Sequence, residues 1–277
     1  MTCYNPELPL VDARGFEAFQ ESHFKTATHL PWPELKQRMN ELPARPAKLQ
    51  LLADSLYLEE AHSFLVEKGY HLEWGLSDTD FQSLIKKSPG LAVSGTESRI
   101  LWSPSSLIET FVTEYANQPS SDAKPLALDI GCGGGRDAVY LSMNGWDVTG
   151  IDHKESAMQR AKQLADFHQQ SVHWYTCSVK ESGCLPSQPV DLIVVIRYLN
   201  RALFDSIKTL LKPNGYLVFQ TFVEGVEAFG SPKNPNYILK KGELAKTFKD
   251  FRIIVDRIDT LNDGRPVASF IAQKIKD

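Results

Sequence analysis

The sequence predicts an α/β protein: a small α/β domain followed by a doubly wound, mostly parallel sheet of seven strands. Strand-like runs rich in Val, Ile, Leu and aromatic residues alternate with helical patterns in the second half of the 277 residues. Such alternation is typical of a parallel sheet with helices on both faces. With 42% hydrophobic and 23% charged residues, the chain is neither disordered, collagen-like nor a coiled coil.

The larger sheet is expected in the second half of the chain. Its strands are expected at residues 126–130, 147–151, 172–176, 191–196, 216–222, 252–258 and 267–275. The helices between the first five strands are expected at residues 136–144, 154–169 and 202–211. Pro213 and Gly215 follow the last of these and are typical of a helix end. Asp263-Gly264 separates the last two apolar runs, which predicts an antiparallel hairpin.

The first hundred residues repeat this alternation on a smaller scale. We expect short strands at residues 8–13 and 49–53, and helices at 34–40 and 58–68. Breaks rich in polar residues, Pro or Gly lie at residues 87–95 and 117–124, and the helix expected at 105–115 leads into the larger sheet. The chain is therefore divided into residues 1–90 and residues 91–277.

Charge and cysteine content limit the expected partners and compartment. The net charge is −4 and neither half is strongly basic, which disfavours binding through nucleic-acid phosphates. No apolar run approaches the roughly 20 residues of a membrane span, and the residues before Pro9 show no leader pattern. The four cysteines form no CxxC pair and are too sparse for a disulfide scaffold. We therefore expect a cytoplasmic protein with no membrane partner.

A glycine-rich loop is the most informative segment. The run Asp129-Ile130-Gly131-Cys132-Gly133-Gly134-Gly135-Arg136 follows an apolar strand and opens a helix, the context that a nucleotide-binding loop requires. A dinucleotide fingerprint would need a small residue where Arg136 stands. The spacing instead fits Asp-x-Gly-x-Gly-x-Gly, and an acid before the loop suits a cationic ligand better than a pyrophosphate.

In these motifs the sequence resembles the class I S-adenosylmethionine-dependent methyltransferases, a Rossmann-like family. Asp152 ends the second strand, where the family places an acid that binds the ribose hydroxyls. Asp191 opens the fourth strand, and Leu-Lys-Pro-Asn-Gly precedes the fifth, both as in the family. Ser178 stands where the family commonly has an Asp that reaches the adenine. The resemblance implies S-adenosyl-L-methionine as the cofactor, held by Asp129, Gly131, Cys132, Gly133, Gly135, Asp152, His153, Ser178 and Arg197.

The segment after the fourth strand, residues 197–201, and residues 234–244 are similar to the tellurite- and thiopurine-type branch, whose members methylate small molecules. This resemblance implies a thiol or other chalcogen as the acceptor. Ligands of such sheets bind at the carboxyl ends of the strands. We expect Arg197 to orient an anionic substrate and Tyr198 to form a wall of the methyl channel. A structural Arg–carboxylate pair with a packed Tyr is an equal alternative for these two residues.

The first domain resembles the opening of a rhodanese domain. The residues that carry this resemblance are Asp12 and Arg14 at the end of a strand and the segment 29–31. Rhodanese chemistry depends on a Cys in the loop after the central strand. That loop is Ala53-Asp54-Ser55-Leu56-Tyr57 here and contains no Cys, so we expect no sulfurtransferase activity.

Three functions therefore remain open. The leading hypothesis is an enzyme that transfers a methyl group from S-adenosylmethionine to a small molecule. The second is an RNA or protein methyltransferase in which the first domain recognises the macromolecule. The third is a non-catalytic scaffold that binds S-adenosylmethionine. No metal is expected, because His153, His168 and His173 lack ligand spacing.

Overall fold

The computed structural model describes residues 4–116 and 123–276, and the chain forms two compact units, Met1–Ser103 and Pro104–Asp277. The first unit extends past the predicted boundary at residue 90. Strand β6 (Ala92–Val93) pairs with β2 (His23–Phe24), and Leu101 belongs to the core of the first unit. The polar break predicted at residues 117–124 falls largely outside the described residues.

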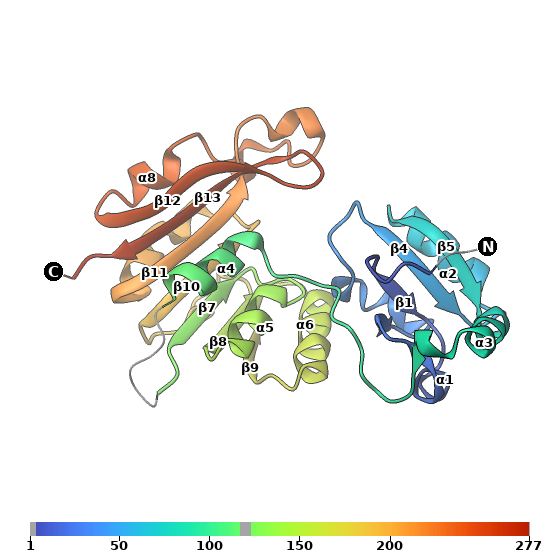
Figure 1. The fold of residues 1–277 in the computed structure, drawn as a ribbon. Coiled ribbons are helices and arrows are strands. Elements are labelled where there is room, and N and C mark those ends of the chain that lie inside the picture. Colours follow the sequence, from blue (N-terminus) through green and yellow to red (C-terminus); the bar gives the residue numbers. More distant parts are fainter. Residues whose placement is uncertain (1–3, 117–122, 277) are drawn as a thin grey trace. The chain divides into compact units, whose positions relative to one another are not determined.

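The first unit is built on four parallel strands in the order β3-β1-β4-β5 (Figure 1). These strands are β1 (Leu10–Asp12), β3 (Ala27–His29), β4 (Lys48–Ala53) and β5 (His71–Ser77). The helices are α1 (Phe16–Glu21), α2 (Leu58–Glu67) and α3 (Asp78–Lys87). The helix predicted at 34–40 is wrong: two short 3-10 turns, Glu34–Lys36 and Met39–Glu41, stand there. Pro31, Pro33 and Pro43 flank this stretch and limit a longer helix.

The second unit contains a seven-stranded sheet in the order β12-β13-β11-β10-β7-β8-β9. Its strands are β7 (Leu126–Ile130), β8 (Asp147–Asp152), β9 (Val172–Thr176), β10 (Val190–Ile196), β11 (Leu211–Phe222), β12 (Phe251–Thr260) and β13 (Pro266–Lys274). The predicted final hairpin is confirmed, because β13 is antiparallel to both β12 and β11. The other pairs, β11·β10, β10·β7, β7·β8 and β8·β9, are parallel.

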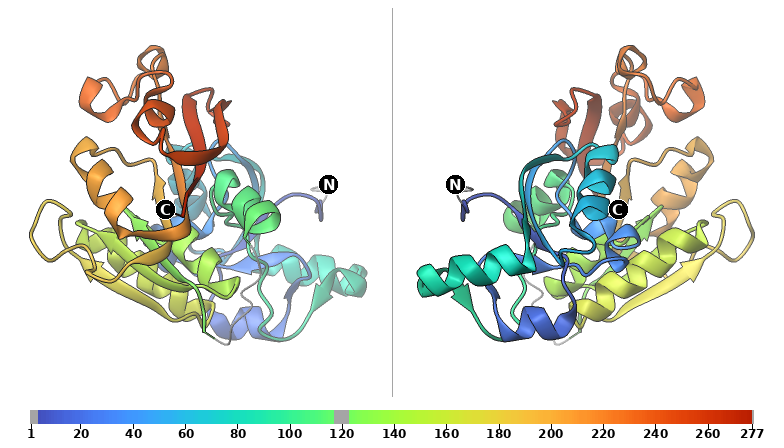
Figure 2. Two further views of the ribbon diagram at one scale, coloured as in Figure 1. Left: turned by 90° about the vertical axis from the view of Figure 1, so that its left-hand side faces the viewer. Right: turned by 90° about the vertical axis from the view of Figure 1, so that its right-hand side faces the viewer.

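Helices cover both faces of this sheet (Figures 1 and 2). The helices of the second unit are α4 (Ser106–Thr110), α5 (Arg136–Met143), α6 (Glu155–Phe167), α7 (Phe204–Leu210) and α8 (Glu243–Thr247), and a π turn (Phe111–Tyr115) continues α4. Alternate residues of each strand enter two separate cores. On β10, Leu192 and Val194 pack with α4 and α5 on one face, whereas Ile193 and Val195 pack with α7 and α8 on the other.

Strand β11 begins earlier than expected, at Leu211 rather than Tyr216. The turn predicted at Pro213 and Gly215 is present as an irregularity in this strand: Val190 pairs with Leu211, and Leu192 pairs with Tyr216. In the described part of the chain, no helix is both long and apolar enough to cross a membrane.

Candidate functional site

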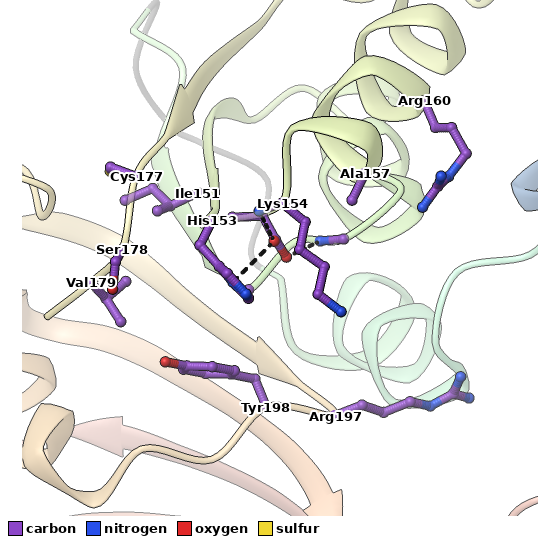
Figure 3. A pocket seen from close by; sticks show the side chains of 13 residues that line it. Ile151, His153, Lys154, Ala157, Arg160, Cys177, Ser178, Val179, Arg197 and Tyr198 are labelled. Carbon is purple, nitrogen blue, oxygen red and sulfur yellow. Dashed lines mark hydrogen bonds and ion pairs between the residues drawn. The ribbon is translucent and has the colours of Figure 1, made fainter. Parts of the chain in front are cut away.

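A cavity of about 320 Å³ lies at the carboxyl ends of the parallel strands β7, β8, β9 and β10 (Figure 3). This is the edge at which open α/β sheets bind ligands. The glycine loop forms its floor, and the segments that follow β8, β9 and β10 form its walls. The residues that line it are Gly131, Gly133, Ile151, Asp152, His153, Lys154, Ala157, Arg160, Cys177, Ser178, Val179, Arg197 and Tyr198.

The glycine loop turns through left-handed backbone that favours glycine. Gly131 has φ +75°, and a Cβ there would lie 3.0 Å from the Tyr198 ring. Gly135 has φ +79°, and a Cβ there would lie 2.7 Å from the Cβ of Ala161 on α6. The loop can therefore pass between the pocket and α6 only without side chains at these two positions.

Asp152, at the end of β8, is fixed at the pocket wall by backbone donors. The Gly133 N–H donates to its Oδ2 at 3.0 Å, and the Lys154 N–H donates to its Oδ1 at 2.9 Å. The ring Nδ1 of His153 lies 3.5 Å from Oδ1 (Figure 3). Only 11% of the Asp152 side chain is exposed. Each carboxylate oxygen retains a lone pair that can accept from a ligand hydroxyl.

A buried acid with an unpartnered oxygen lies beneath the loop. Asp129 is 1% exposed, and its Oδ2 has no hydrogen-bond partner among the described residues. Burial raises the pKa of Asp129 well above its ordinary value, and the neighbouring carboxylates of Asp137 and Asp152 raise it further. A buried charge is costly unless it is paired. A cationic group bound in the pocket would supply that pairing.

Asp137, in the first turn of α5, is the second acid of this cluster. Its carboxylate accepts from the Ser105 N–H at 2.6 Å, which joins α5 to the start of α4. Burial raises the pKa of Asp137, and the Ser105 hydrogen bond and the charge of Arg197 oppose that rise. Three acids, Asp129, Asp137 and Asp152, thus lie close together at the glycine loop, whereas the motif predicted only the one before it.

The wall after β9 carries a disulfide that the sequence did not predict. Cys177 lines the cavity and is bonded to Cys184, seven residues along the same loop. Ser178 and Val179 lie inside this small loop and face the pocket. The two cysteines stand seven residues apart in the sequence, and this short spacing was the signal from which the bond could have been predicted.

The wall after β10 consists of Arg197 and Tyr198. Arg197 has φ +56°, and its N–H donates to the Gln220 carbonyl at 2.6 Å. Its guanidinium points away from Ser178 and Val179 (Figure 3). Burial raises the pKa of the Tyr198 phenol, although a hydrogen bond with Asn200 opposes the rise.

Of the predicted site residues, seven line the cavity: Gly131, Gly133, Asp152, His153, Ser178, Arg197 and Tyr198. Asp129 lies beneath the loop, and Gly135 is the N-cap of α5. The thiol of Cys132 does not line the cavity but lies 3.7 Å from the Met158 sulfur, and burial strongly raises its pKa.

Sequence reasoning missed six lining residues: Ile151, Lys154, Ala157, Arg160, Cys177 and Val179. Helical spacing was a usable signal for Lys154, Ala157 and Arg160, which stand three residues apart just after the acid of β8. Within the described ranges, no group of three or more His, Cys, Asp or Glu side chains could hold a metal ion.

An α/β sheet with a glycine loop, a carboxylate held at the next strand end and a buried acid with one unpartnered oxygen is an arrangement suited to a cationic, nucleoside-like ligand. Residues 128–217 match the family model described as a methyltransferase domain. This match lies within the second unit and agrees with the methyltransferase resemblance of its motifs.

Two relatives extend the comparison. An uncharacterized protein of Schizosaccharomyces pombe is 26% identical over 98% of this chain and 94% of its own length. A ubiquinone biosynthesis O-methyltransferase of Coxiella burnetii is 30% identical over 46% of this chain. The chain spans 56% of that enzyme's length. The similarity to the first protein thus covers both units, and the similarity to the enzyme covers less than half of this chain.

Two solved structures are similar to the chain over about three fifths of its length. TehB from Haemophilus influenzae is 20% identical, with a TM-score of 0.47 over 61% of this chain and 67% of that one. The N-methyltransferase NodS from Bradyrhizobium japonicum, solved with S-adenosyl-L-homocysteine, is 18% identical, with a TM-score of 0.49 over 62% of this chain and 85% of that one.

Proposed function

We propose that this protein transfers a methyl group from S-adenosylmethionine to a small-molecule acceptor, a thiol or other chalcogen, by in-line displacement. The observation that carries the proposal is the unpartnered Oδ2 of the fully buried Asp129 beneath the glycine loop. A buried acid with one unpartnered oxygen fits a cofactor that carries positive charge.

The lining residues fit the parts of that cofactor. Asp152 would accept from the ribose hydroxyls, beside His153. Ser178 would contact the adenine end of the cofactor, and Arg197 would contact the opposite end. Cys132 and Gly135 would act indirectly, by fixing the shape of the loop whose Gly131 and Gly133 face the pocket. The bound cofactor supplies an activated methyl group on a positively charged sulfur.

The protein's own contribution is alignment and exclusion of water. Tyr198 would form one wall of the path along which the acceptor approaches. Arg197 would orient an anionic acceptor. The competing structural role for Arg197, as the partner of a carboxylate, is supported by its effect on the pKa of Asp137. A thiol acceptor needs little help from a general base, because a fraction of it is already ionised at neutral pH.

A hydroxyl acceptor is the second candidate, favoured by one observation. His153 lines the pocket with its ring Nδ1 3.5 Å from the Asp152 carboxylate, an arrangement that suits a general base. The ubiquinone biosynthesis relatives are named as O-methyltransferases, which is consistent with such an acceptor.

For the first unit we propose a rhodanese-like domain without sulfurtransferase activity. Its four parallel strands and the buried Asp12–Arg14 ion pair at 2.6 Å support the resemblance. The loop after β4 carries Asp54 where rhodanese chemistry needs a thiol, and burial together with Asp78 raises the pKa of this acid. A carboxyl group there would oppose a persulfide anion. We further propose that the protein is cytoplasmic, with the Cys177–Cys184 bond as a single local link rather than part of a disulfide scaffold.

The test is methyl transfer from labelled S-adenosylmethionine to three acceptors: thiophenol, catechol and bulk tRNA. Label on thiophenol is the expected result, and label on catechol would favour the hydroxyl candidate. Label on tRNA alone would replace the small-molecule proposal with an RNA methyltransferase. Cofactor binding without transfer to any acceptor would favour the scaffold.

A further inference from the structure

Three cationic side chains, Lys154, Arg160 and Arg197, line one side of the cavity. Figure 3 shows their charged ends on the side away from Ser178 and Val179, which also line the pocket. The acids of the site, by contrast, gather at the glycine loop and at the end of β8. The cavity therefore has a negative floor and a positive side.

These three cations have no protein partner. In the described ranges, the side chains of Lys154, Arg160 and Arg197 form no hydrogen bond and no ion pair. Another arginine of the second unit is fully paired, because the Nε and Nη2 of Arg201 donate to the two carboxylate oxygens of Glu243 at 2.6 and 2.9 Å. An arginine that lines a cavity without such a partner is available to an oxyanion of a ligand.

The sequence around the start of α6 explains why two of these cations stay unpaired. Partners on a helix stand three or four residues apart. Those positions hold Ala157 and Met158 after Lys154, and they hold no acid on either side of Arg160. Asp152 stands two residues before Lys154, but its carboxylate oxygens accept backbone N–H groups. Lys154 and Arg160 thus face the cavity with only the small Ala157 between them.

We propose that Lys154 and Arg160, together with Arg197, bind an oxyanion group of the methyl acceptor, a carboxylate or a phosphate ester that is separate from the atom receiving the methyl group. This inference rests on the proposed function and deepens it, because it names a chemical group that the acceptor carries. The fork of an arginine matches two oxygens of such a group, and a lysine adds a point charge. Three like charges on one cavity also concentrate anionic ligands there.

The carboxylate of the cofactor is the competing ligand for these cations. S-adenosylmethionine carries a single carboxylate, and Arg197 is the group proposed above for that end of the cofactor. Lys154 and Arg160 are then left for a second anion. 5′-Methylthioadenosine separates the two cases, because it keeps the nucleoside and lacks the amino-acid portion.

The test measures how methylated products bind to the full-length protein loaded with S-adenosylhomocysteine, by titration calorimetry. The probes are 3-(methylthio)propionate, 2-(methylthio)ethyl phosphate and the neutral 2-(methylthio)ethanol, so that the reactivity of a thiol does not enter the comparison. Lys154→Gln and Arg160→Gln each remove one charge, and Arg160→Lys keeps the charge without the fork. The matched control is Lys162→Gln, which removes a charge from the same helix but does not line this cavity.

For the wild type we expect one or both anionic probes to bind about tenfold more tightly than the alcohol, and the tighter one identifies the oxyanion. Lys154→Gln and Arg160→Gln should each lose most of this advantage, Arg160→Lys should lose less, and the control should lose none. Added salt should weaken the binding of the anionic probes alone. The affinities for the alcohol, S-adenosylhomocysteine and 5′-methylthioadenosine should not change in any variant.

Equal affinity for the anionic and neutral probes, or no measurable binding of any of them, would overturn the inference. So would weaker binding of S-adenosylhomocysteine to Lys154→Gln or Arg160→Gln with the affinity for 5′-methylthioadenosine unchanged, because these cations would then hold the carboxylate of the cofactor. A wild-type protein that binds no S-adenosylhomocysteine would contradict the proposed function instead, and the preference for anionic probes, measured on the unloaded protein, would still decide whether the cations form a site.

Discussion

Asp152 at the end of β8 accepts the backbone N–H of Gly133 at 3.0 Å, so one carboxylate joins a strand end to the glycine turn of the neighbouring strand. The same group offers its remaining lone pairs to the cavity. The shape of the loop and the proposed contact with the ribose of the cofactor therefore involve one side chain. This dual role makes Asp152 the most informative position for substitution.

Replacing Asp152 by Ala should weaken S-adenosylhomocysteine binding at least tenfold. The loss follows because hydrogen bonds to a charged group contribute about 1.5–3 kcal/mol. Calorimetry measures it. Asp147→Ala is the matched control on the same strand, where the acid lies beside the exposed His173 rather than the pocket. Equal affinity for the wild type and Asp152→Ala would remove this acid from the site.

Replacing Gly131 by Ala should destabilise the second unit by about 1–3 kcal/mol and weaken cofactor binding. The added Cβ would lie 3.0 Å from the Tyr198 ring at a backbone φ of +75°. Gly145→Ala separates the two causes, because Gly145 also has a positive φ, +86°, but its Cβ would meet nothing within 4 Å. Urea unfolding should show a larger loss at Gly131 than at Gly145, and equal losses would exclude the ring contact.

Asp129 should make the ligand-free protein less stable as pH rises. The pKa of Asp129 in the folded protein is raised, mainly by burial. Its contribution to the free energy of unfolding is therefore complete below the ordinary pKa near 3.8, and it is lost as pH rises through the raised pKa. Asp129→Asn should therefore increase the stability at neutral pH, by about 1 kcal/mol or more, and flatten the pH profile. Urea unfolding between pH 4 and 8 measures both effects.

The same variant should bind S-adenosylmethionine more weakly, because the cofactor loses a charge partner. Greater stability together with weaker binding is the expected signature. A variant that is less stable at neutral pH and binds normally would show that the acid serves the fold rather than the ligand.

The Cys177–Cys184 disulfide should stabilise the wall of the cavity that carries Ser178 and Val179. Reduction should lower the free energy of unfolding by about 2–3 kcal/mol, the usual contribution of a bond that closes a short loop. Urea unfolding with and without a dithiol reductant tests this expectation. In the variant with Ser at both positions the reductant should have no effect, and a wild type indifferent to it would show that the bond is not formed in solution.

The parallel core of the second unit could be predicted because its strands are buried on both faces and read as continuous apolar runs. Ile193 and Val195 on one face and Leu192 and Val194 on the other are such a run. The glycine loop and Asp152 could also be predicted, since their chemistry depends on spacing within a few residues.

Other features of the structure depend on tertiary packing, which the spacing of residues in the sequence does not show. The helix expected at 34–40 was lost to neighbouring prolines, and residues 91–103 joined the first unit through pairing with β2 and burial of Leu101. The contact of Arg201 with Glu243 joins residues 42 positions apart. The disulfide depends on the path of the loop that brings Cys177 next to Cys184, and the number of cysteines does not predict that path.

The most direct test of the central claim is calorimetric titration of S-adenosylmethionine and S-adenosylhomocysteine into the purified protein, with NADH as the control ligand. We predict micromolar binding of the first two and none of NADH, because the acids around the glycine loop favour a cationic ligand and oppose a pyrophosphate. Binding of NADH, or of none of the three, would contradict a methyltransferase built on Asp129 and Asp152.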